Sequence, residues 1–403
     1  MTGMSARIIT AARVLTGCGA THVPGAVMVD EDKIAWVGPT SDLPGDWLGA
    51  CVERIDLPQA SVLPGLIDAH VHLAFGGAAH LPAAIQATNR LDAAATIRAG
   101  LAELLGAGVT TVRDLGAPRY TDIDTLTRHD NRVRVLTATI PLTVAGGHCH
   151  SLGGGVDTLT GVRDLVAANA ARGADWVKIM GSGGFTTGGT SSPYEPQFTD
   201  TQVRAAVDAA HEHGLPIAAH AHGTAAIRQA VAAGVDSIEH CTWMTADGFD
   251  LDHGLVREIA DREILVCPTI NHLARAAAGR LPWPVRRDHL RVMLKAGVRL
   301  ILGSDSGIQH TPPGCYPHSL PAYLDLGLTP AEVIDLATRQ AADALRIGHL
   351  TGTLAAGLSA DLIAVPGDPT RDLDLLTRPI LTVAAGHLHY PDSTPEAEEN
   401  ASA

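Results

Sequence analysis

Two histidines separated by one residue are the first candidates for chemistry. His70 and His72 close an apolar segment that begins at Gly65. Residues i and i+2 of a β-strand point to the same side, so a strand here would turn both imidazoles toward one space. Two imidazoles on one face make up half of a typical zinc site. The ordinary alternative is chance, because the chain has 20 histidines and a histidine at a strand end is more often a packed core residue.

A single lysine inside an apolar segment is the second candidate. Of the 29 basic residues only three are lysines, and Lys178 is the one that lies in a strand-like run, Trp176–Met180. An ammonium group is costly to bury there. Lysine, unlike arginine, can lose its proton and react with carbon dioxide to form a carbamate, an anionic bidentate ligand. An ion-paired or snorkelling lysine at a strand end is the alternative, and the residues alone leave both open.

Three more residues end strand-like segments and are followed at once by loop or turn chemistry. They are His220, His240 and Asp305. Together with the earlier candidates they make four histidines, one lysine and one aspartate at the same end of five expected strands. Such a set can hold two divalent ions with a bridging hydroxide. Asp305 would then be placed to take the proton from that hydroxide.

The elements that must bring these residues together follow a repeating order. Short apolar runs alternate with alanine-rich segments of helical period, which is typical of a parallel sheet or barrel. Eight such units match the usual size of a (β/α)₈ TIM barrel, so we expect an α/β fold with a barrel over residues 62–349. We expect its strands to begin near residues 65, 110, 134, 176, 216, 237, 264 and 299.

Both ends of the chain are β-rich. Short strand-like runs divided by turn residues occupy residues 1–61, and similar runs occupy residues 350–390. Spacing alone does not say whether the two ends pair. The tail, residues 391–403, is acidic and rich in small residues, and we expect it to be disordered.

Composition excludes several classes of protein. The chain carries 43 acidic against 29 basic side chains, a net charge of −14, which disfavours nucleic-acid binding through a basic face. No apolar run reaches the roughly 18 residues that span a bilayer, and no secretory signal is evident, so we expect a cytoplasmic location and no membrane partner. The six cysteines lie far apart without a C-x-x-C pair, which argues against a zinc knuckle or a disulfide framework.

The motifs together resemble those of the amidohydrolase superfamily, in its binuclear-metal, carboxylated-lysine type. The resemblance covers nearly the whole chain. It implies a (β/α)₈ barrel with a small β-sandwich domain formed by both chain ends, residues 1–61 plus 350–390. The segments that carry it are Leu63–His72, Gly108–Asp114, Ile217–Gly223, Ser237–His240, Leu302–Asp305 and Gly357–Leu362.

The same resemblance implies a role for each candidate ligand. The H-x-H pair would bind the more buried ion, and the two histidines of the later strands would bind the more exposed ion. Lys178, carboxylated by CO₂, would bridge the two ions, and Asp305 would both ligate and shuttle the proton. We expect two divalent ions with a bias to Zn²⁺, held by His70, His72, Lys178, His220, His240 and Asp305.

Departures from other branches of the superfamily narrow the expectation. Deaminases have an acid shortly after the fifth-strand histidine and no bridging lysine, whereas here Ala221 follows His220 and Lys178 is present. Dihydroorotase-like members carry an arginine two residues after the H-x-H pair, where this chain has Ala74. The lysine followed by Gly181–Gly184 is most similar to the Xaa-Pro dipeptidase and carboxypeptidase-like group, which is related to imidazolonepropionase.

Four further residues are candidate substrate contacts. In the dipeptidase-like group a loop histidine after the third strand polarises the scissile carbonyl, and His148 is the first choice for that role and His150 the second. The alternative for either is a solvated loop histidine. His222 would contact the leaving group or the carbonyl oxygen, although some relatives have tyrosine there. The glycine-rich loop Gly181–Phe198, with Tyr194, is either an active-site loop or a plain connection.

The sequence therefore predicts a metal-dependent hydrolase that cleaves an amide bond, of dipeptide or N-acyl amino acid type, in a small molecule. A metal-bridging hydroxide would attack a carbonyl polarised by His148, and Asp305 would pass the proton to the leaving nitrogen. Two alternatives stay open: hydrolysis of a carbamate, ester or lactone on the same site, and a non-catalytic barrel that binds a ligand. Homo-oligomerisation is also left open.

Overall fold

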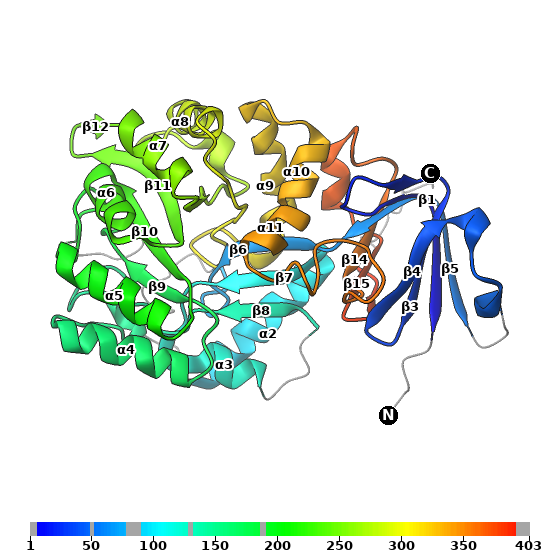
Figure 1. Ribbon diagram of the computed structural model, residues 1–403, viewed down its shortest axis with the longest axis horizontal. Helices are drawn as coiled ribbons and strands as arrows, with labels where there is room; N and C mark the ends of the chain where they lie inside the picture. Colours follow the sequence, from blue (N-terminus) through cyan, green and yellow to red (C-terminus); the bar gives the residue numbers. More distant parts are fainter. Residues whose placement is uncertain (1–5, 49–51, 78–89, 128–131, 186–190, 392–403) are drawn as a thin grey trace, which may run out of the picture.

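The computed structural model describes residues 6–48, 52–77, 90–127, 132–185 and 191–391. Figure 1 shows an α/β part, coloured cyan to yellow, beside a mostly β part built from the blue and red ends of the chain. No helix among these described residues is long and apolar enough to cross a membrane. The tail that we expect to be disordered, residues 391–403, lies outside the described residues apart from Pro391.

Two sheets make the centre of the α/β part. Their strands are parallel, apart from β12, and are almost wholly buried, apart from β8 and β12, which are half-buried. Strands buried on both faces are rich in apolar residues, which explains why the sequence shows them so clearly. One sheet comprises β6 (Leu66–Val71), β7 (Val109–Asp114) and β8 (Arg134–Thr137); the other comprises β9 (Val177–Met180), β10 (Ile217–Gly223), β11 (Ser237–Thr245), β12 (Gly248–Phe249) and β13 (Leu265–Cys267).

Single parallel bridges connect these sheets to each other and to the segment after α8. They pair Leu142 with Ile179, Val266 with Leu300, and Val71 with Ser306. Seven of the eight expected strands are present. The eighth, expected near residue 299, makes only single bridges instead of a ladder, so the secondary structure is α/β with open sheets.

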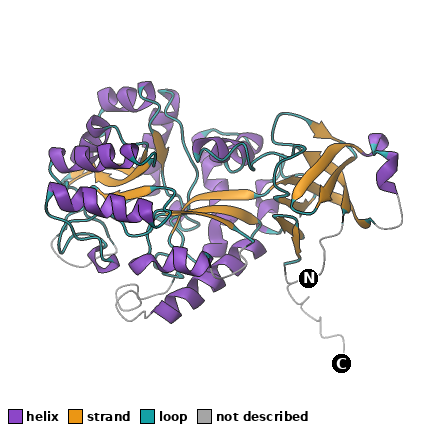
Figure 2. Ribbon diagram, turned by 60° about the horizontal axis from the view of Figure 1, so that its bottom comes forward, coloured by secondary structure: helices purple, strands orange, loops and turns teal. Residues whose placement is uncertain are grey.

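Helices cover the outer faces of these sheets (Figure 2). Their ends follow local chemistry: Thr199 and Gln202 form a capping box that starts α5, and Gly234, with φ of 84°, ends α6. The helices are α2 (Arg90–Gly106), α3 (Thr121–Leu126), α4 (Leu159–Ala171), α5 (Asp200–Glu212), α6 (Thr224–Ala233), α7 (His253–Asp261), α8 (Trp283–Lys295), α9 (Tyr316–Ser319), α10 (Pro330–Leu336) and α11 (Arg339–Ala344).

The two ends of the chain meet in one sheet. β14 from the C-terminal end pairs antiparallel with β5 from the N-terminal end, in the order β16-β15-β14-β5-β1-β3-β4, with β2 paired to β1. β5 ends at Pro64 and β6 begins at Leu66, so the terminal sheet continues almost directly into the strand that carries His70. The strands are β1 (Arg7–Leu15), β2 (Thr21–His22), β3 (Gly25–Asp30), β4 (Lys33–Pro39), β5 (Glu53–Pro64), β14 (Leu362–Pro366), β15 (Leu381–Ala384) and β16 (His387–His389).

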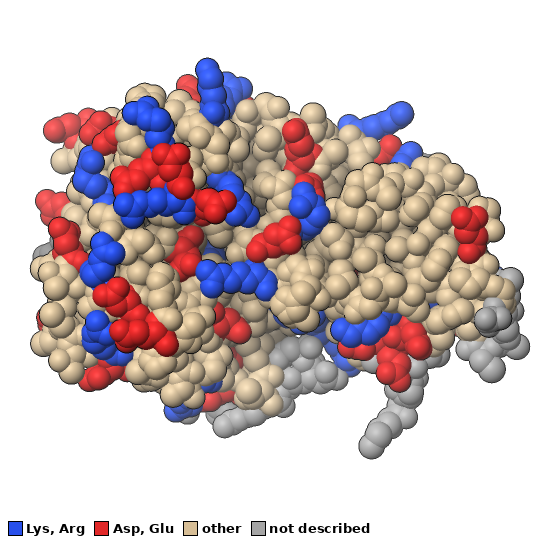
Figure 3. Space-filling model, in the orientation of Figure 1, with Lys and Arg blue, Asp and Glu red and all other residues tan. Residues whose placement is uncertain are grey.

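On the face shown in Figure 3, basic and acidic side chains are interspersed over the α/β part. No single-sign basic patch dominates that face, in keeping with the acidic composition.

Candidate active site

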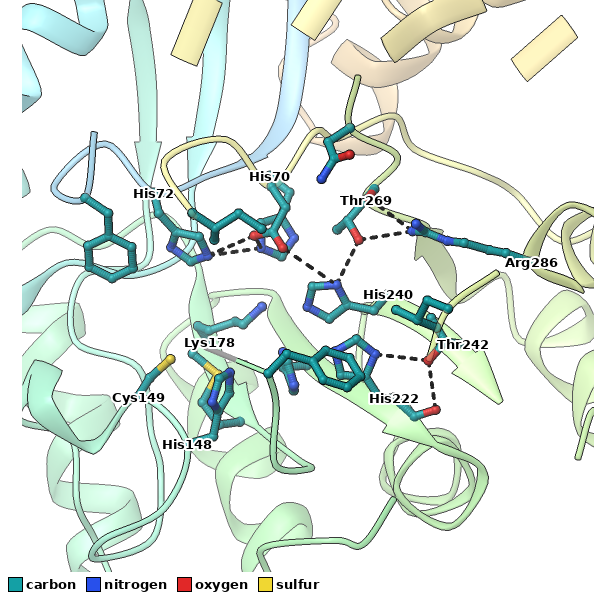
Figure 4. Close-up of a pocket in the computed structure, with 18 of the residues that line it drawn as sticks. His70, His72, His148, Cys149, Lys178, His222, His240, Thr242, Thr269 and Arg286 are labelled. Carbon is teal, nitrogen blue, oxygen red and sulfur yellow. Dashed lines mark hydrogen bonds and ion pairs between the residues drawn. The ribbon is translucent and has the colours of Figure 1, made fainter. Parts of the chain in front are cut away.

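One cavity at the carboxyl ends of β6, β9, β10 and β11 gathers the predicted metal ligands (Figure 4). Side chains that the sequence spreads over more than 230 positions meet there. All six expected ligands line it, and so do two of the four expected substrate contacts, His148 and His222.

The first group in the cavity consists of His70, His72 and Asp305. The Nε2 atoms of the two histidines lie 3.3 Å apart, and each lies 3.3 Å from Oδ1 of Asp305. Donors about 2.0–2.1 Å from a tetrahedral zinc ion lie about 3.3–3.4 Å from one another. The three atoms therefore have the spacing of one face of a zinc tetrahedron.

A buried ionic network that sequence reasoning missed orients His70. Its Nδ1 lies 2.7 Å from Oε2 of Glu239, and Oε1 of Glu239 accepts from Arg113 at 3.0 Å and from Ser237 at 2.6 Å. Burial raises the pKa of Glu239, but Arg113 and His70 outweigh it and hold the pKa below its ordinary value. Glu239 stays ionised and accepts the Nδ1 proton, which leaves Nε2 of His70 free to bind metal.

The backbone at the end of β11 explains why the sequence did not predict that Glu239 belongs to the site. Neighbouring residues of a regular strand point to opposite faces, so Glu239 and His240 should not share a site. His240 has φ of 69°, in the left-handed region, and this break in the strand lets both side chains reach His70. The only signal in the sequence was an acidic residue inside an apolar strand.

A second group consists of His220, His222 and His240. One nitrogen of each lies within 4.8 Å of the others, and the ring of His240 lies 4.5 Å from each of its two neighbours. Nε2 of His220 lies 3.0 Å from the carbonyl oxygen of Gly183. A carbonyl only accepts, so Nε2 carries the proton and Nδ1 of His220 keeps its lone pair.

Two threonines fix the other rings of this group. Nδ1 of His240 lies 2.8 Å from Oγ1 of Thr269, whose own proton goes to the carbonyl of Pro268. Nδ1 of His222 lies 3.0 Å from Oγ1 of Thr242, which donates to the His222 carbonyl. Each threonine oxygen must then accept from the imidazole, so both histidines are protonated on Nδ1 and free on Nε2.

Four of these imidazoles, those of His70, His220, His222 and His240, are neutral at pH 7. Burial lowers the pKa of His70 to about 4 and that of His222 to about 3. Burial also lowers the pKa values of His220 and His240 well below the ordinary range. The neutral imidazole is the form that binds a metal ion.

Lys178 lies between the two groups, with its amine directed into the cavity (Figure 4). The side chain is fully buried, and its Nζ has no hydrogen-bond partner in the structure. Burial lowers the pKa of this amine. A lowered pKa favours the neutral amine, which is the form that combines with carbon dioxide, and the lack of a partner for Nζ among the described residues does not fit an ion-paired strand-end lysine.

The four expected substrate contacts separate into two pairs. His148 and His222 are buried in the cavity, and the His148 ring lies 4.7 Å from that of His220. A side chain at Gly184 would approach the His148 ring to 2.4 Å, so glycine is required there. His150 is exposed, with Nδ1 turned back to its own turn, and Tyr194 is half-buried outside the cavity lining, so neither contacts the cavity.

Several residues of the cavity wall were not foreseen. Phe185 packs edge-on against His222 with ring centroids 4.8 Å apart, and Arg286 reaches in from α8. A phenylalanine in a loop and an arginine on a helix give no sequence signal by themselves, because such residues are common on protein surfaces. The other unforeseen lining residues include Phe75, Cys149, Met180, Thr242, Thr269, Asn271, Leu281 and Ile308.

Comparisons with known proteins agree with this geometry. Ochratoxinase of Aspergillus niger is 28% identical over 419 residues, covering 92% of this chain and 83% of the relative. Imidazolonepropionase of Salinispora tropica is 28% identical over 402 residues, covering 91% and 92%. The crystal structure of a Xaa-Pro dipeptidase with bound methionine in the active site matches with a TM-score of 0.83 and 26% identity, covering 96% of this chain and 100% of that one.

The sequence model of the Amidohydrolase family matches residues 61–388, which is most of the chain. The predicted class of enzyme, a hydrolase acting on carbon–nitrogen bonds with dipeptidase-like relatives, is thereby confirmed. All the residues that line the cavity lie within the matched range, and the chain belongs to the amidohydrolase family.

Proposed function

We propose that this protein hydrolyses the amide bond of a small dipeptide-like or N-acyl amino acid substrate with the help of two divalent metal ions. The observation that carries the proposal is the amine of Lys178, which is buried between two histidine groups and has no partner among the described residues. A lone buried amine is unfavourable, and carboxylation converts it into an anion that two cations can share. The name Xaa-Pro dipeptidase, given to a chain 26% identical to this one, supports a peptide-like substrate.

The donor set fits the two ions. His70, His72 and Asp305 would hold the first, and His220 and His240 the second, with carboxylated Lys178 shared between them. Histidine and carboxylate donors suit zinc. When bound, the two ions would supply an activated water and polarise the substrate carbonyl.

The protein's own residues complete the reaction. Asp305 borders both histidine groups, since its Oδ2 lies 4.0 Å from Nδ1 of His240. Its carboxylate accepts the proton of the attacking water and delivers it to the leaving nitrogen. His148 and His222 orient the carbonyl and the leaving group, and apolar side chains such as Phe185 line the cavity beside them.

The proposed fold and organisation go with this function. Residues 62–349 form a (β/α)₈ barrel that the single bridges at Leu300 and Ser306 help to close, and residues 1–61 plus 350–390 form the β-sandwich domain. A cytoplasmic location and a homo-oligomer stay predictions. Cell fractionation checks the first, and sedimentation equilibrium checks the second.

The substitution Lys178→Ala tests the proposal. We expect the metal content to fall below two ions per chain and hydrolysis to fall by at least about 1,000-fold, because the shared ligand is lost. Lys295→Ala, on α8, is the matched control. Protein labelled with ¹³CO₂ should give a carbamate carbon resonance that the Lys178→Ala variant lacks.

A substrate panel decides the bond. Dipeptides and N-acetyl amino acids are compared with matched esters and carbamates, and we expect the amides to be turned over best. Full metal content and turnover in the Lys178→Ala variant would refute the metal scheme. Turnover of esters or carbamates alone would replace the amide by the alternative bond.

A further inference from the structure

Arg286 is the one cation that α8 sends into the cavity among the described residues of that helix. It lies in the first turn of α8, and its side chain reaches the cavity wall beside the second histidine group (Figure 4). Its Nη2 donates to the carbonyl of Thr269 at 3.0 Å and to Oγ1 of the same residue at 3.4 Å. These two bonds anchor the guanidinium at the end of β13.

The positive charge of Arg286 is not matched by the protein. It forms no ion pair with any described residue, and its Nε is buried without a hydrogen-bond partner. The carboxylate that attracts Arg286 is that of Asp305, and this carboxylate already contacts His70 and His72. Arg286 is half-buried, and a cation partly withdrawn from water without a matching charge is unfavourable, so proteins usually retain one only where an anion completes it.

Arg113 shows how this chain treats a buried arginine that has a structural role. Arg113 is fully buried, and its donors are used by Glu239, Ser237 and the carbonyl of Ala69. It also stacks on Trp176 with its Cζ 4.4 Å from the ring centroid. Arg286, by contrast, has a neutral residue as its only partner and faces the cavity.

We infer that Arg286 binds the carboxylate of the substrate and thereby selects small acids over their neutral analogues. The inference rests on the proposed function, because it names the anchor of the same cavity. The guanidinium offers the unused Nε–H and its remaining Nη hydrogens to a carboxylate, a planar and charge-assisted contact that arginine makes well.

The neighbours of Arg286 say which part of a substrate it meets. Thr269 connects Arg286 to His240, so the acid group would lie on the side of the second histidine group. Leu281 and Phe185 line the same cavity and offer apolar surface for a side chain. An amino acid with an apolar side chain, joined through its nitrogen to an acyl group, has carboxylate, side chain and scissile bond in a matching arrangement.

A binding experiment on the full chain loaded with zinc tests the inference without turnover. The probes are L-methionine, which has a free carboxylate, and L-methioninamide, which lacks the charge. Calorimetry should show that wild-type protein prefers the acid. In Arg286→Gln we expect the affinity for L-methionine to fall about 10- to 100-fold, and that for L-methioninamide to change less than about threefold.

Matched variants show whether Arg286 binds the substrate carboxylate or only holds Thr269 in position. Arg287→Gln removes the same charge from the next residue, which pairs with Asp288, and should change neither affinity. Arg286→Lys keeps a charge and should retain part of the preference for the acid. Circular dichroism and zinc content of each variant check that the fold and the metal site persist, and the lysine variant decides the question if the glutamine variant does not fold.

Three outcomes would overturn the inference, and a fourth would refute only the proposed function. Equal losses for the acid and the amide in Arg286→Gln would mean that Arg286 only positions Thr269 and His240. If wild-type protein binds both probes equally, or binds neither, Arg286 does not bind the substrate carboxylate. A clear preference for the acid in a protein that hydrolyses no N-acetyl-L-methionine or dipeptide would instead leave Arg286 as the anchor and refute the proposed function alone.

Discussion

The two histidine groups of the cavity are oriented by different chemistry. In the first group, His70 donates to a carboxylate, Glu239, that is itself held by Arg113. In the second group, His220 donates to a carbonyl and His240 to a threonine hydroxyl. A carboxylate partner makes an imidazole a stronger ligand than a neutral partner does. In the proposed two-ion scheme, this difference predicts that the first group would hold its ion more tightly and that the second group would hold the ion that meets the substrate.

Of the changes considered, removal of the Glu239 carboxylate should have the largest effect on the difference between the two histidine groups. In Glu239→Gln, Arg113 keeps a buried charge without its partner, so we expect the free energy of unfolding to fall by about 3 kcal/mol. The affinity of the first group for zinc should fall about 10- to 100-fold. Denaturant unfolding and zinc titration measure the two effects.

Two further variants show whether the charge or the orientation matters in that experiment. Glu258→Gln removes an exposed carboxylate on α7 and should change neither quantity. The double variant Arg113→Gln with Glu239→Gln should regain stability but not zinc affinity. A first group that keeps its affinity in both Glu239 variants would contradict the role assigned to the carboxylate.

Acid pH should destabilise the metal-free protein through both groups. The pKa of His70 is about 4 and that of His222 about 3 in the fold, against an ordinary value of 6.5. Between pH 7 and pH 5 the unfolded chain takes up protons that the folded chain does not, so stability falls as the pH falls. Each such histidine should cost about 2 kcal/mol over that range.

Denaturant unfolding of chelator-treated protein at several pH values measures this loss. Exchange of His222 for Asn should flatten the dependence between pH 7 and pH 5, whereas exchange of the exposed His253 for Asn should leave it unchanged. Metal-free protein with equal stability at pH 7 and pH 5 would show that these imidazoles are not held neutral by burial.

Gradual chelation should reveal the difference in affinity directly. We expect one ion to leave at a chelator concentration at least about tenfold below that needed for the other, because the ligands differ in basicity. Absorption spectra of cobalt-substituted protein follow the two ions. Departure of both ions together would mean that the shared lysine, not the histidine partners, governs retention.

Removal of a threonine hydroxyl should have the smallest effect. In Thr269→Val, His240 loses the acceptor for its Nδ1 proton, and we expect the affinity of the second group for zinc to fall about tenfold. Thr242→Val does the same to His222 and serves as the comparison. If His222 contacts substrate, this second variant should change KM or kcat and leave the zinc content intact; a loss of zinc there would make His222 a ligand.

Most of the α/β part was predictable because its strands are buried on both faces. Strands such as β10 and β11 are buried along nearly their whole length, and the helices beside them show capping residues such as Thr199. α8 begins at Trp283, because Pro282 and Pro284 suit the first turn of a helix. The pairing of the two chain ends through β5 and β14 was not visible in their spacing.

The predicted ligands were found because strand ends carry a simple positional signal. His70, His72, Lys178 and His220 lie on regular strand or directly at its end, where alternation gives the direction of the side chain. His150 and Tyr194 lie in loops, where the sequence gives no direction, and both stand outside the cavity.

By itself, the sequence determined which residue types could do chemistry here: imidazoles, one lysine and one aspartate at the ends of apolar strands. Only the tertiary structure decided which backbone conformations and partner side chains orient these residues. His240, Thr269 and Asp305 all have left-handed backbone conformations, which local sequence does not specify and which surrounding packing must impose. Glu239 and Arg286 acquire their roles from partners 169 and 17 residues away, because burial and charge balance are properties of the folded molecule and not of the chain.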